Sequence, residues 1–447
     1  MTLRFGTDGV RGIANSELTV ELVTALGRAA VRVLGADAPF VVGRDTRRSG
    51  PMLEAALVAG ICAEGADALL VGVLPTPGVA HIARDRGAPG AVISASHNPF
   101  ADNGVKLFSA GGRKIPEPQE ARVEAELIEL ATSDPGPGPE GIRVGVASED
   151  RGANDVYIAH LVDALDGRRM EDMTVVLDCG NGASFRTAPT ALRELGAMVE
   201  VLSSAPDGTN INAGCGSTYP EALQEAVVAA GADVGLALDG DADRVIAVDE
   251  RGEIVDGDQM LAVGALDLHD RGLLRGEAVV ASVMSNLGLE RALEPYGIEL
   301  IRTAVGDRNV LEEMERRNLV LGGEQSGHVI NALHSTTGDG TLTGIMLLDV
   351  MTRRRRPLSE LASVMVPVPQ VLRNVEITNP SELNSDTTFW SRVRAIEYEL
   401  GDDGRVLVRL SGTEPLVRVM VESLDPDAAA DAAERLVELV EHAASKH

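Results

Sequence analysis

The sequence predicts an α/β protein with three similar α/β domains and a smaller C-terminal α+β domain. Its 447 residues exceed the length of one ordinary domain, which favours a division into three or four units. Short apolar runs alternate with helical patterns in three successive sets, as in domains whose sheets are covered by helices on both faces. The pattern changes after Pro369. We therefore expect domains over residues 1–149, 150–252, 253–368 and 369–447.

The first set alternates strands with helices. Three short runs rich in Val, Leu and Ile are expected as strands: residues 39–43, 68–73 and 91–96. Helical patterns over residues 52–65 and 78–86 separate them. This alternation predicts a largely parallel sheet. Pro and Gly recur between Thr132 and Gly141, so we expect a surface loop there, near the end of the domain.

The second and third sets repeat this arrangement. Six further runs begin as apolar strands and end in turns: residues 174–183, 199–204, 234–244, 279–286, 298–307 and 319–327. Each set places a glycine-rich or acidic turn directly after a strand, where open α/β sheets usually bind ligands. Beyond Pro369, a strand pair over residues 406–423 and an amphipathic helix from about Asp427 to Ala444 predict the smaller domain. Trp390 is expected in its core, with sugar stacking as the alternative.

The composition disfavours several classes of protein. Hydrophobic residues make up 44% of the chain and charged residues 24%, the balance of a globular rather than a disordered or fibrous protein. No run reaches the roughly 20 apolar residues of a membrane helix, and the N-terminal sequence lacks the pattern of a secretory signal. The net charge of −28 disfavours nucleic acid and anionic membranes as partners. We expect a cytoplasmic protein in which a locally basic site receives an anionic substrate.

The three cysteines and one run of arginines also bear on the class of protein. Cys62, Cys179 and Cys215 are scattered and odd in number, so neither a disulfide framework nor a zinc site is expected. We expect reduced thiols, mostly in the core. The run from Arg353 to Arg356 follows an apolar helical stretch, which indicates charge at a helix C-terminus. A nucleic-acid patch is the alternative.

A serine loop, SASHNP, follows the third expected strand. Ser96 would be exposed on this strand-to-loop turn, and a basic neighbour such as His97 or Lys106 could stabilise an attached phosphate. Most serines in polar loops serve as turn or cap residues, and that role is the alternative.

An acidic loop, DGDADR, ends the strand that begins at residue 234. Asp239, Asp241 and Asp243 alternate, so their carboxylates point the same way and repel one another unless a cation lies among them. Three oxygen ligands of this kind indicate Mg²⁺. An EF-hand is disfavoured because Arg244 occupies the position of its glycine. A solvated acidic turn is the alternative.

A third loop, GGEQSGH, also carries polar side chains. In GGEQSGH, Glu324 and Ser326 could bind sugar hydroxyls, and His328 could contact a phosphate or move a proton. A simple turn with a surface histidine is equally compatible with this string.

The last loop, RLSGTEPLVR, has the composition of a phosphate cradle. Ser411, Gly412 and Thr413 would let backbone N–H groups and two hydroxyls face an oxyanion, while Arg409 and Arg418 could bind it from the sides. The Gly-Lys-Ser/Thr ending of a P-loop is absent, so ATP is not implied. Structural ion pairs are the alternative for the two arginines.

Five strings in this order resemble the signature loops of the α-D-phosphohexomutase superfamily, and they span the whole chain: FGTDGVRG at residues 5–12, SASHNP, DGDADR, GEQSGH and RLSGTEP. The resemblance implies four domains around a central cleft, with mixed sheets in the first three. In chain order they would carry the phosphoserine, the metal, the sugar and the distal phosphate. PDGTNINAGCGS at residues 206–217 and HSTTGDG at residues 334–340 resemble the phosphoglucosamine mutase branch. Ala304, Asn309 and Leu410 depart from the commonest residues of that branch, but none removes a matched catalytic group.

The resemblance also implies roles for individual residues. The catalytic set would be Ser96, Arg11, Lys106, Arg244 and His328. The substrate-binding set would be Glu324, Ser326, Arg409, Ser411, Gly412, Thr413 and Arg418. Mg²⁺ would be held by phosphorylated Ser96 with Asp239, Asp241 and Asp243.

The implied reaction interconverts glucosamine 6-phosphate and glucosamine 1-phosphate through a 1,6-bisphosphate and feeds UDP-N-acetylglucosamine synthesis. The expected partners are the phosphosugar substrate and the bisphosphosugar intermediate. Phosphomannomutase or phosphoglucomutase activity is one alternative, and a non-catalytic phosphosugar-binding protein is another. Intact Ser96 and aspartates disfavour the non-catalytic alternative. The oligomeric state stays open, with a homodimer among the alternatives.

Overall fold

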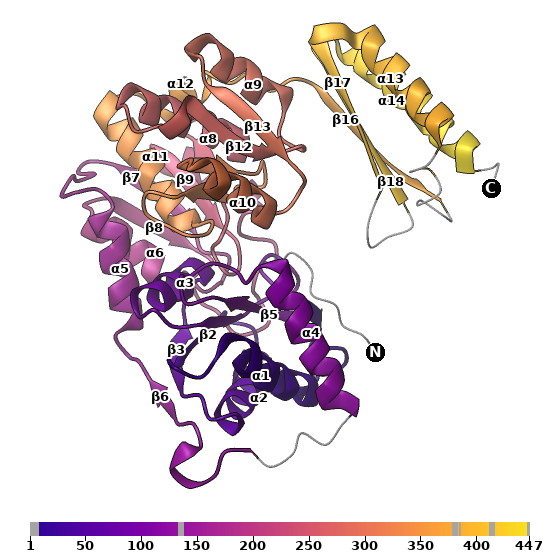
Figure 1. Cartoon of the computed structure of the whole chain (residues 1–447). Helices are drawn as coiled ribbons and strands as arrows, with labels where there is room; N and C mark the ends of the chain where they lie inside the picture. Colours follow the sequence, from indigo (N-terminus) through magenta and orange to yellow (C-terminus); the bar gives the residue numbers. More distant parts are fainter. Residues whose placement is uncertain (1–8, 133–137, 378–382, 384–385, 411–415, 445–447) are drawn as a thin grey trace. The chain divides into compact units, whose positions relative to one another are not determined.

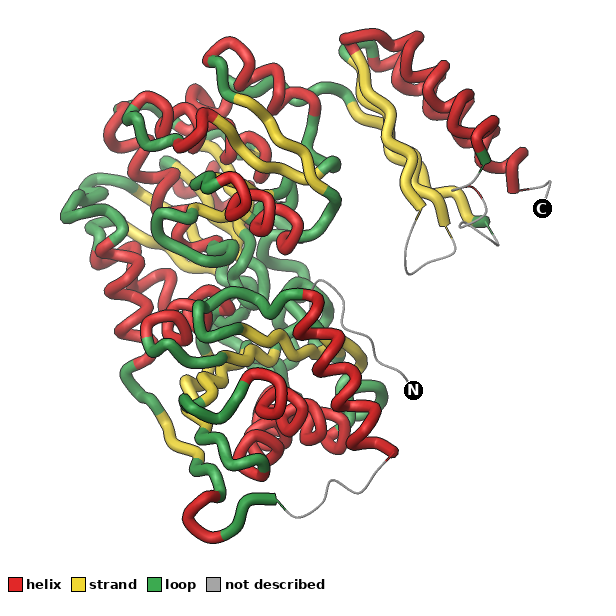
Figure 2. The backbone as a smooth tube through the Cα atoms, in the orientation of Figure 1, coloured by secondary structure: helices red, strands yellow, loops and turns green. Residues whose placement is uncertain are grey.

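The computed structural model describes residues 9–132, 138–377, 383, 386–410 and 416–444, which form two units. The larger unit comprises Met1–Ser282 and Ile301–Ser363, and the smaller comprises Val283–Leu300 and Val364–His447. The larger unit contains two whole sheets and most of a third, each flanked by helices (Figures 1 and 2).

The first sheet has six strands in the order β1-β5-β4-β2-β3-β6. Their bounds are β1 Val10–Ile13, β2 Phe40–Arg44, β3 Ala68–Val73, β4 Gly90–Ile93, β5 Asp102–Phe108 and β6 Ala147–Glu149. The three expected strands are confirmed and run parallel, but β5 pairs antiparallel with both β1 and β4. The sheet is therefore mixed, as the resemblance implied, rather than largely parallel, as the alternation of strands and helices predicted. The string DNGVKLF was not expected as a strand because it begins with turn-forming residues.

Helices cover both faces of this sheet. They are α1 Val20–Leu34, α2 Gly50–Ala63, α3 Thr76–Asp85 and α4 Glu117–Thr132, with α1 and α2 on the face opposite α3 (Figure 1). The expected helices α2 and α3 begin two residues earlier than predicted, and each has proline in its first turn, where the missing N–H needs no partner. A Cβ on Gly60 would lie 2.1 Å from the carbonyl oxygen of Thr24, so glycine permits the close packing of α1 on α2.

The second sheet has the order β11-β10-β9-β7-β8. Its strands are β7 Thr174–Asp178, β8 Met198–Leu202, β9 Val234–Leu238, β10 Val245–Asp249 and β11 Ile254–Val255, and its helices are α5 Ala153–Asp163, α6 Thr187–Glu194 and α7 Glu221–Ala230. Strands β9 and β10 pair antiparallel, with Leu238 opposite Val245. The DGDADR string is thus the tight connection of a hairpin.

The third sheet has the order β13-β12-β14-β15. Its strands are β12 Ala278–Ser282, β13 Glu299–Thr303, β14 Leu321–Gly323 and β15 Val329–Asn331. The helices of this part of the chain are α8 Gly257–Asp270, α10 Asp307–Arg317, α11 Gly340–Arg354 and α12 Leu358–Ala362. The GEQSG string connects β14 to β15, which pair antiparallel. A second hairpin therefore presents the third predicted site loop.

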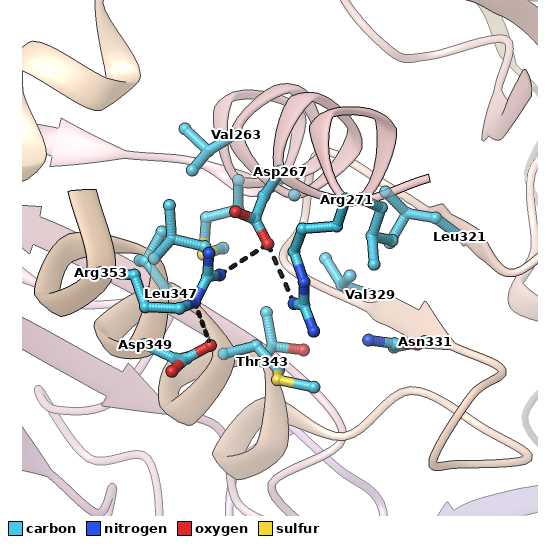
Figure 3. Close-up of a pocket in the computed structure, with 15 residues that line it drawn as sticks. Val263, Asp267, Arg271, Leu321, Val329, Asn331, Thr343, Leu347, Asp349 and Arg353 are labelled. Carbon is cyan, nitrogen blue, oxygen red and sulfur yellow. Dashed lines mark hydrogen bonds and ion pairs between the residues drawn. The ribbon is translucent and has the colours of Figure 1, made fainter. Parts of the chain in front are cut away.

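The arginine run ends α11, as expected from its position. Arg353 donates to Asp349 at 2.8 Å and to Asp267 of α8 at 2.7 Å, and Arg271 joins Asp267 at 3.2 Å (Figure 3). Arg354 pairs with Asp270 at 2.6 Å. These ion pairs join α8 to α11, so the interpretation as charge at a helix C-terminus is confirmed.

The smaller unit contains α9 Leu287–Leu293 and a three-stranded antiparallel sheet in the order β16-β18-β17. Its other elements are β16 Gln370–Glu376, α13 Thr387–Leu400, β17 Gly404–Leu410, β18 Leu416–Ser423 and α14 Pro426–Ala444. Helices α13 and α14 lie on one face of the sheet (Figures 1 and 2). Trp390 packs partly buried against this core and donates from Nε1 to the carbonyl of Leu383 at 2.8 Å. The strand pair, the final helix and the core position of Trp390 are confirmed.

Several remaining expectations can be compared with the structure. Cys179 and Cys215 are buried, Cys62 is half-buried, and all three are free thiols, as expected. None of the helices in the described part of the chain combines the length and apolar character that a bilayer crossing requires. Of the loop expected over residues 132–141, residues 133–137 lie outside the described residues. The described residues also include short 3-10 helices at Gly141–Arg143, Arg275–Glu277, Glu294–Tyr296 and Gly401–Asp403.

Candidate active site

Ser96 lies three residues beyond the end of β4, in a strained and buried position. Its backbone φ is +53°, a conformation that non-glycine residues adopt at a cost of about 1–3 kcal/mol. The expectation of an exposed serine is wrong, because Ser96 is only 1% exposed. The DGDADR hairpin covers it so closely that a Cβ on Gly240 would lie 2.5 Å from the Ser96 carbonyl oxygen. Tertiary packing therefore buries a loop that would be exposed in an isolated domain.

The Ser96 hydroxyl points at the acidic hairpin. Its Oγ donates to Oδ2 of Asp239 at 2.5 Å, and His97 Nδ1 lies 3.3 Å from the same Oγ. The two residues are 143 positions apart in the chain, so the fold brings together the first and second predicted site loops.

The three aspartates of the hairpin form one buried cluster. Each offers a carboxylate oxygen that lies within 4.8 Å of the others. Oδ1 of Asp241 and Oδ1 of Asp243 accept no hydrogen bond within the described part of the chain. Buried carboxylate oxygens are costly without a partner, and a divalent cation would supply one. The alternative of a solvated acidic turn is wrong, and the donor set fits a metal ion.

Lys106 supplies a positive charge to this cluster from β5. Its Nζ donates to Oδ2 of Asp241 at 2.7 Å and to Oδ2 of Asp243 at 3.2 Å, and the side chain is buried. Thr76, in the first turn of α3, also donates to Oδ2 of Asp241 at 2.6 Å. The acidic hairpin is thus held by side chains from the first sheet and its helices.

The pKa values of Asp239 and Asp243 are shifted in opposite directions. Burial raises the pKa of Asp239 well above its usual value, and the neighbouring charges of Asp243 and Asp241 raise it further. Burial opposes ionisation of Asp243 too, but Lys106 and then His328 hold its pKa well below the usual range. The raised pKa of Asp239 reflects the crowding of three buried carboxylates, which a bound metal ion would relieve.

His328 lies at the base of the third predicted site loop, beside the acidic cluster. It is 2% exposed, so the alternative of a surface histidine is wrong. Its Nδ1 lies 3.7 Å from Oδ1 of Asp243, and its Nε2 accepts the backbone N–H of Gly338 at 3.2 Å. Burial alone would lower the pKa of His328, but Asp243 raises it above the usual value.

Two arginines complete the surroundings of Ser96. The backbone N–H of Arg244 donates to Oδ1 of Asp239 at 3.2 Å, and its Nε lies 3.8 Å from Oδ1 of Asp243. Arg11, on β1, donates to Oδ1 of Asn98 at 3.4 Å. The structure therefore brings Ser96, Lys106, His328 and Arg244 together around the three aspartates, and it places Arg11 beside the Ser96 loop.

The residues predicted to read the sugar lie in the β14–β15 connection. Oε1 of Glu324 accepts the backbone N–H of Gly306 at 3.1 Å, and Ser326 is exposed. Gly327 has φ +88°, and a Cβ there would lie 1.9 Å from the carbonyl oxygen of Val245. Glycine therefore allows this loop to pack on the start of β10, next to the acidic hairpin.

The predicted phosphate cradle belongs to the smaller unit. Arg409 on β17 and Arg418 on β18 are directly opposite in the antiparallel register, so both side chains share one face of the sheet. Ser411, Gly412 and Thr413 lie outside the described residues.

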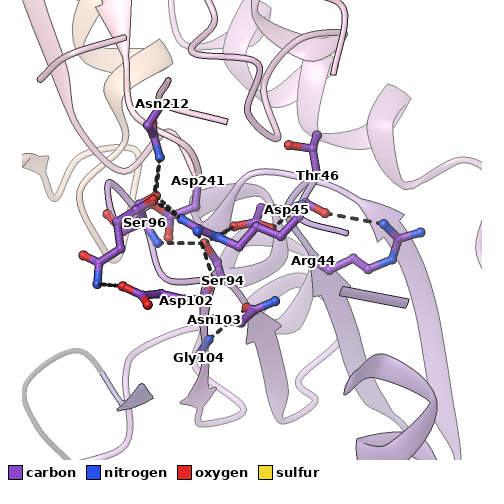
Figure 4. A network of polar contacts seen from close by, with 12 residues as sticks. Arg44, Asp45, Thr46, Ser94, Ser96, Asp102, Asn103, Gly104, Asn212 and Asp241 are labelled. Atoms are coloured by element: carbon purple, nitrogen blue, oxygen red, sulfur yellow. Dashed lines mark hydrogen bonds and ion pairs between the residues drawn. The ribbon is translucent and has the colours of Figure 1, made fainter. Parts of the chain in front are cut away.

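Sequence reasoning missed three groups that support Ser96. Arg47 and Asp45, which follow β2, hold the Ser96 loop, and Nδ2 of Asn212 donates to the Ser96 carbonyl at 2.9 Å (Figure 4). The available signal was the string GRDTRRSG, in which charged residues directly follow an apolar strand. Asn212 lies in the string at residues 206–217 that resembles the phosphoglucosamine mutase branch, but nothing local in that string links it to Ser96.

Comparisons with known proteins agree with this arrangement. Four domain families of phosphoglucomutase/phosphomannomutase match the chain: alpha/beta/alpha domain I at residues 2–133, domain II at 155–252, domain III at 256–368 and the C-terminal domain at 359–439. A phosphoglucosamine mutase of Moorella thermoacetica is 54% identical over 94% of this chain and 95% of its own length. One from Streptomyces griseus is 51% identical over 98% of this chain and 99% of its own.

Solved structures show the same fold. A phosphoglucomutase/phosphomannomutase family protein of Burkholderia thailandensis aligns with a TM-score of 0.84 and 26% identity over 99% of this chain and 98% of its own. An N-acetylphosphoglucosamine mutase of Aspergillus fumigatus, in complex with GlcNAc-6P and magnesium, aligns with a TM-score of 0.72 and 18% identity over 99% of this chain and 96% of its own. The chain belongs to the phosphoglucosamine mutases of the phosphoglucomutase/phosphomannomutase family.

Proposed function

We propose that the chain interconverts glucosamine 6-phosphate and glucosamine 1-phosphate, with Ser96 as the phosphoryl carrier and glucosamine 1,6-bisphosphate as the intermediate. The observation that carries the proposal is the 2.5 Å hydrogen bond from Ser96 Oγ to Asp239, inside a buried cluster of three aspartates. A serine in this position can exchange a phosphoryl group next to a metal ion. The names of the close relatives support the choice of sugar.

Asp239, Asp241 and Asp243 would hold the metal, and we propose Mg²⁺ because the donors are hard carboxylate oxygens. When bound, Mg²⁺ would neutralise charge on the transferring phosphoryl group. Lys106, Arg244 and Arg11 would offset the charge of phosphorylated Ser96 from the other sides. Without these cations, a phosphoserine of about −1.5 to −2 would face three carboxylates.

In the forward half-reaction, the O1 hydroxyl of glucosamine 6-phosphate attacks the phosphorus of phosphorylated Ser96. The new O1–P bond forms while the Ser96 Oγ–P bond breaks, the O1 proton is lost, and Ser96 Oγ ends protonated. Two groups contact Oγ and can donate or accept its proton: His97 Nδ1 at 3.3 Å and Asp239 Oδ2 at 2.5 Å. The bisphosphate then turns over and returns its 6-phosphoryl group to Ser96, so product and phosphorylated enzyme are formed together.

The remaining residues would bind the substrate. Glu324 and Ser326 would read sugar hydroxyls, with His328 beside them, and Arg409, Ser411, Gly412, Thr413 and Arg418 would hold the phosphate that is not transferred. We propose the division into domains 1–149, 150–252, 253–368 and 369–447, which the four family matches support. We also propose a cytoplasmic location, which the three free thiols support.

A coupled assay with purified protein tests the choice of sugar. We expect kcat/KM for glucosamine 6-phosphate to exceed that for glucose 6-phosphate by about tenfold to a few hundredfold, since the two differ in one polar group. Glu324→Gln should reduce that ratio, and Glu312→Gln on α10 serves as a matched control. Equal or greater efficiency with glucose or mannose 6-phosphate would assign the chain to another mutase specificity and leave the phosphoserine chemistry standing.

A further inference from the structure

The Ser96 loop is held by a network that the reaction itself does not use. Ser96 has φ +53°, although it is not glycine, and such outliers persist only where the surroundings enforce them. The Ser96 side chain is hydrogen-bonded to Asp239. The contacts that hold its φ angle are therefore those made to the backbone of the loop. These contacts converge on one buried side chain, Arg47.

Arg47 uses its whole guanidinium on this loop. Nη2 donates to the carbonyls of Ser96 and Asn98, each at 2.8 Å. Nη1 donates to the carbonyls of Pro99 and Asp102. Nε donates to Oδ2 of Asp45 at 2.8 Å. A guanidinium has five N–H donors, and all five have an acceptor here, whereas a lysine ammonium has three.

Asp45 completes the network by accepting hydrogen bonds from Arg47 and Ser94. Its Oδ1 accepts the backbone N–H of Arg47 at 2.9 Å, and its Oδ2 accepts the Ser94 hydroxyl at 2.7 Å. Oγ of Ser94 in turn accepts the backbone N–H of Ser96 at 2.9 Å. Both charged side chains of the pair are 0% exposed. The Ser96 carbonyl is thus held by Arg47, and the Ser96 N–H is held through Ser94 by Asp45.

A purely structural role explains this pair poorly. Burying two charges carries a large desolvation penalty, and apolar residues of similar volume often stabilise a core as well or better. What an apolar pair cannot do is hold both ends of the Ser96 peptide unit and three further carbonyls in one geometry. Reactive groups need such fixed geometry, because displacement by about 1 Å can reduce a rate by about 10²-fold.

We infer that Arg47 and Asp45 are positioning residues that hold Ser96 in its left-handed conformation, and so aim Oγ at the incoming phosphoryl group. The inference rests on the proposed function only in taking Ser96 as the phosphoryl carrier. It does not depend on which sugar is the substrate. Neither residue is expected to contact the substrate or the metal.

The test compares Arg47→Lys with Arg48→Lys, a matched change at the neighbouring exposed arginine. Each dephosphorylated protein is mixed with glucose 1,6-bisphosphate and Mg²⁺, and intact mass follows phosphorylation of Ser96 over time. We expect the rate for Arg47→Lys to fall by about 10²-fold per folded molecule, with the bisphosphate concentration at half-maximal rate changed less than about threefold. Arg48→Lys should keep the wild-type rate. Circular dichroism gives the folded fraction.

Ser94→Ala provides the second variant, because it removes one hydroxyl and leaves the buried ion pair in place. We expect its phosphorylation rate to fall by about tenfold while its melting temperature stays near that of the wild type. A wild-type rate in Ser94→Ala, or losses in Arg47→Lys explained entirely by the unfolded fraction, would overturn the inference. If wild-type protein phosphorylates Ser96 but does not turn over glucosamine 6-phosphate, the choice of sugar fails and the positioning role is still decided.

Discussion

At the scale of single residues, the Ser96 hydroxyl is the group on which the proposed chemistry depends. Ser96→Ala removes one oxygen from a buried site and a hydrogen bond to a carboxyl oxygen of Asp239. We expect mutase turnover to be lost, because no phosphoryl carrier remains. The fold should persist, since the left-handed backbone is held by Arg47 and Ser94 rather than by the serine Oγ.

Intact mass and peptide mapping check this prediction. Wild-type protein treated with glucose 1,6-bisphosphate should carry one phosphate, located at Ser96, and the alanine variant should carry none there. Robust turnover by Ser96→Ala would contradict the assignment, as would a phosphate mapped to Ser94 or Ser109 in the wild type.

Removal of the metal acts on the same cluster. Asp241 and Asp243 each have a buried carboxylate oxygen without a hydrogen-bond donor in the described part of the chain. We expect exhaustive chelation to abolish turnover but to leave phosphate already on Ser96 in place, and added Mg²⁺ to restore the rate. Elemental analysis verifies removal of the metal. Full activity in protein shown to be metal-free would contradict the proposed role of the aspartates.

At the scale of secondary-structure elements, a histidine pair between α3 and α5 makes stability depend on pH. The rings of His81 and His160 stack with centroids 3.9 Å apart. Burial lowers the pKa of His160 to about 3, and His81 and Arg84 contribute to the shift. The folded-state pKa thus lies below the unfolded value of 6.5, so the unfolded chain binds a proton that the native chain does not. This contribution to stability is complete above pH 6.5 and is lost as the pH falls towards 3.

The melting temperature of His160→Gln, measured from pH 7.5 to pH 4.5, tests this dependence. We expect the variant to lose less stability than the wild type as the pH falls, because one histidine that charges only on unfolding is gone. His442→Gln, at an exposed position of α14, should follow the wild-type curve. Parallel curves for wild type and His160→Gln would contradict the prediction.

A second prediction at this scale concerns the ion pairs between α8 and α11. Asp267 is buried and accepts from Arg353 and Arg271 (Figure 3), whereas Asp270 is half-exposed and pairs with Arg354. We expect Asp267→Ala to lower the free energy of unfolding by about 2 kcal/mol, because charge-assisted hydrogen bonds at a shielded site are lost. Asp270→Ala should lower it by less than about 1 kcal/mol. Urea unfolding of both variants measures the difference, and equal losses would refute the distinction.

At the scale of the whole molecule, the smaller unit is expected to respond to ligand through two facing arginines. Arg409 and Arg418 are directly opposite on β17 and β18, and like charges in such positions destabilise a strand pair. A bound phosphate would offset their repulsion. We expect glucose 1,6-bisphosphate to slow hydrogen exchange at residues 404–410 and 416–423.

Arg409→Gln provides the control for this measurement, because it removes one charge of the facing pair without a large change of volume. Its exchange should respond less than that of the wild type when ligand is added. Identical exchange in wild-type protein with and without bisphosphate would argue that this unit does not take part in binding.

The sequence by itself determined the α/β class, most of the apolar strands, the final helix and the order of the site loops. These follow from local patterns: apolar runs of strand length, periodic helical stretches, and glycine-rich or acidic turns at strand ends. The three alternating aspartates also pointed to a metal site without any tertiary information, because repulsion among neighbouring carboxylates is a local property.

Only the tertiary structure decided that Ser96 is buried and that β5 pairs antiparallel with its neighbour in the first sheet. It also decided that Arg47 and Asn212 hold the serine loop. Asn212 lies 116 positions from Ser96, and Thr76 lies 165 positions from Asp241. A local pattern contains no information on partners at such separations. They are brought together by the packing of whole sheets and helices, and that packing depends on contacts summed over the chain.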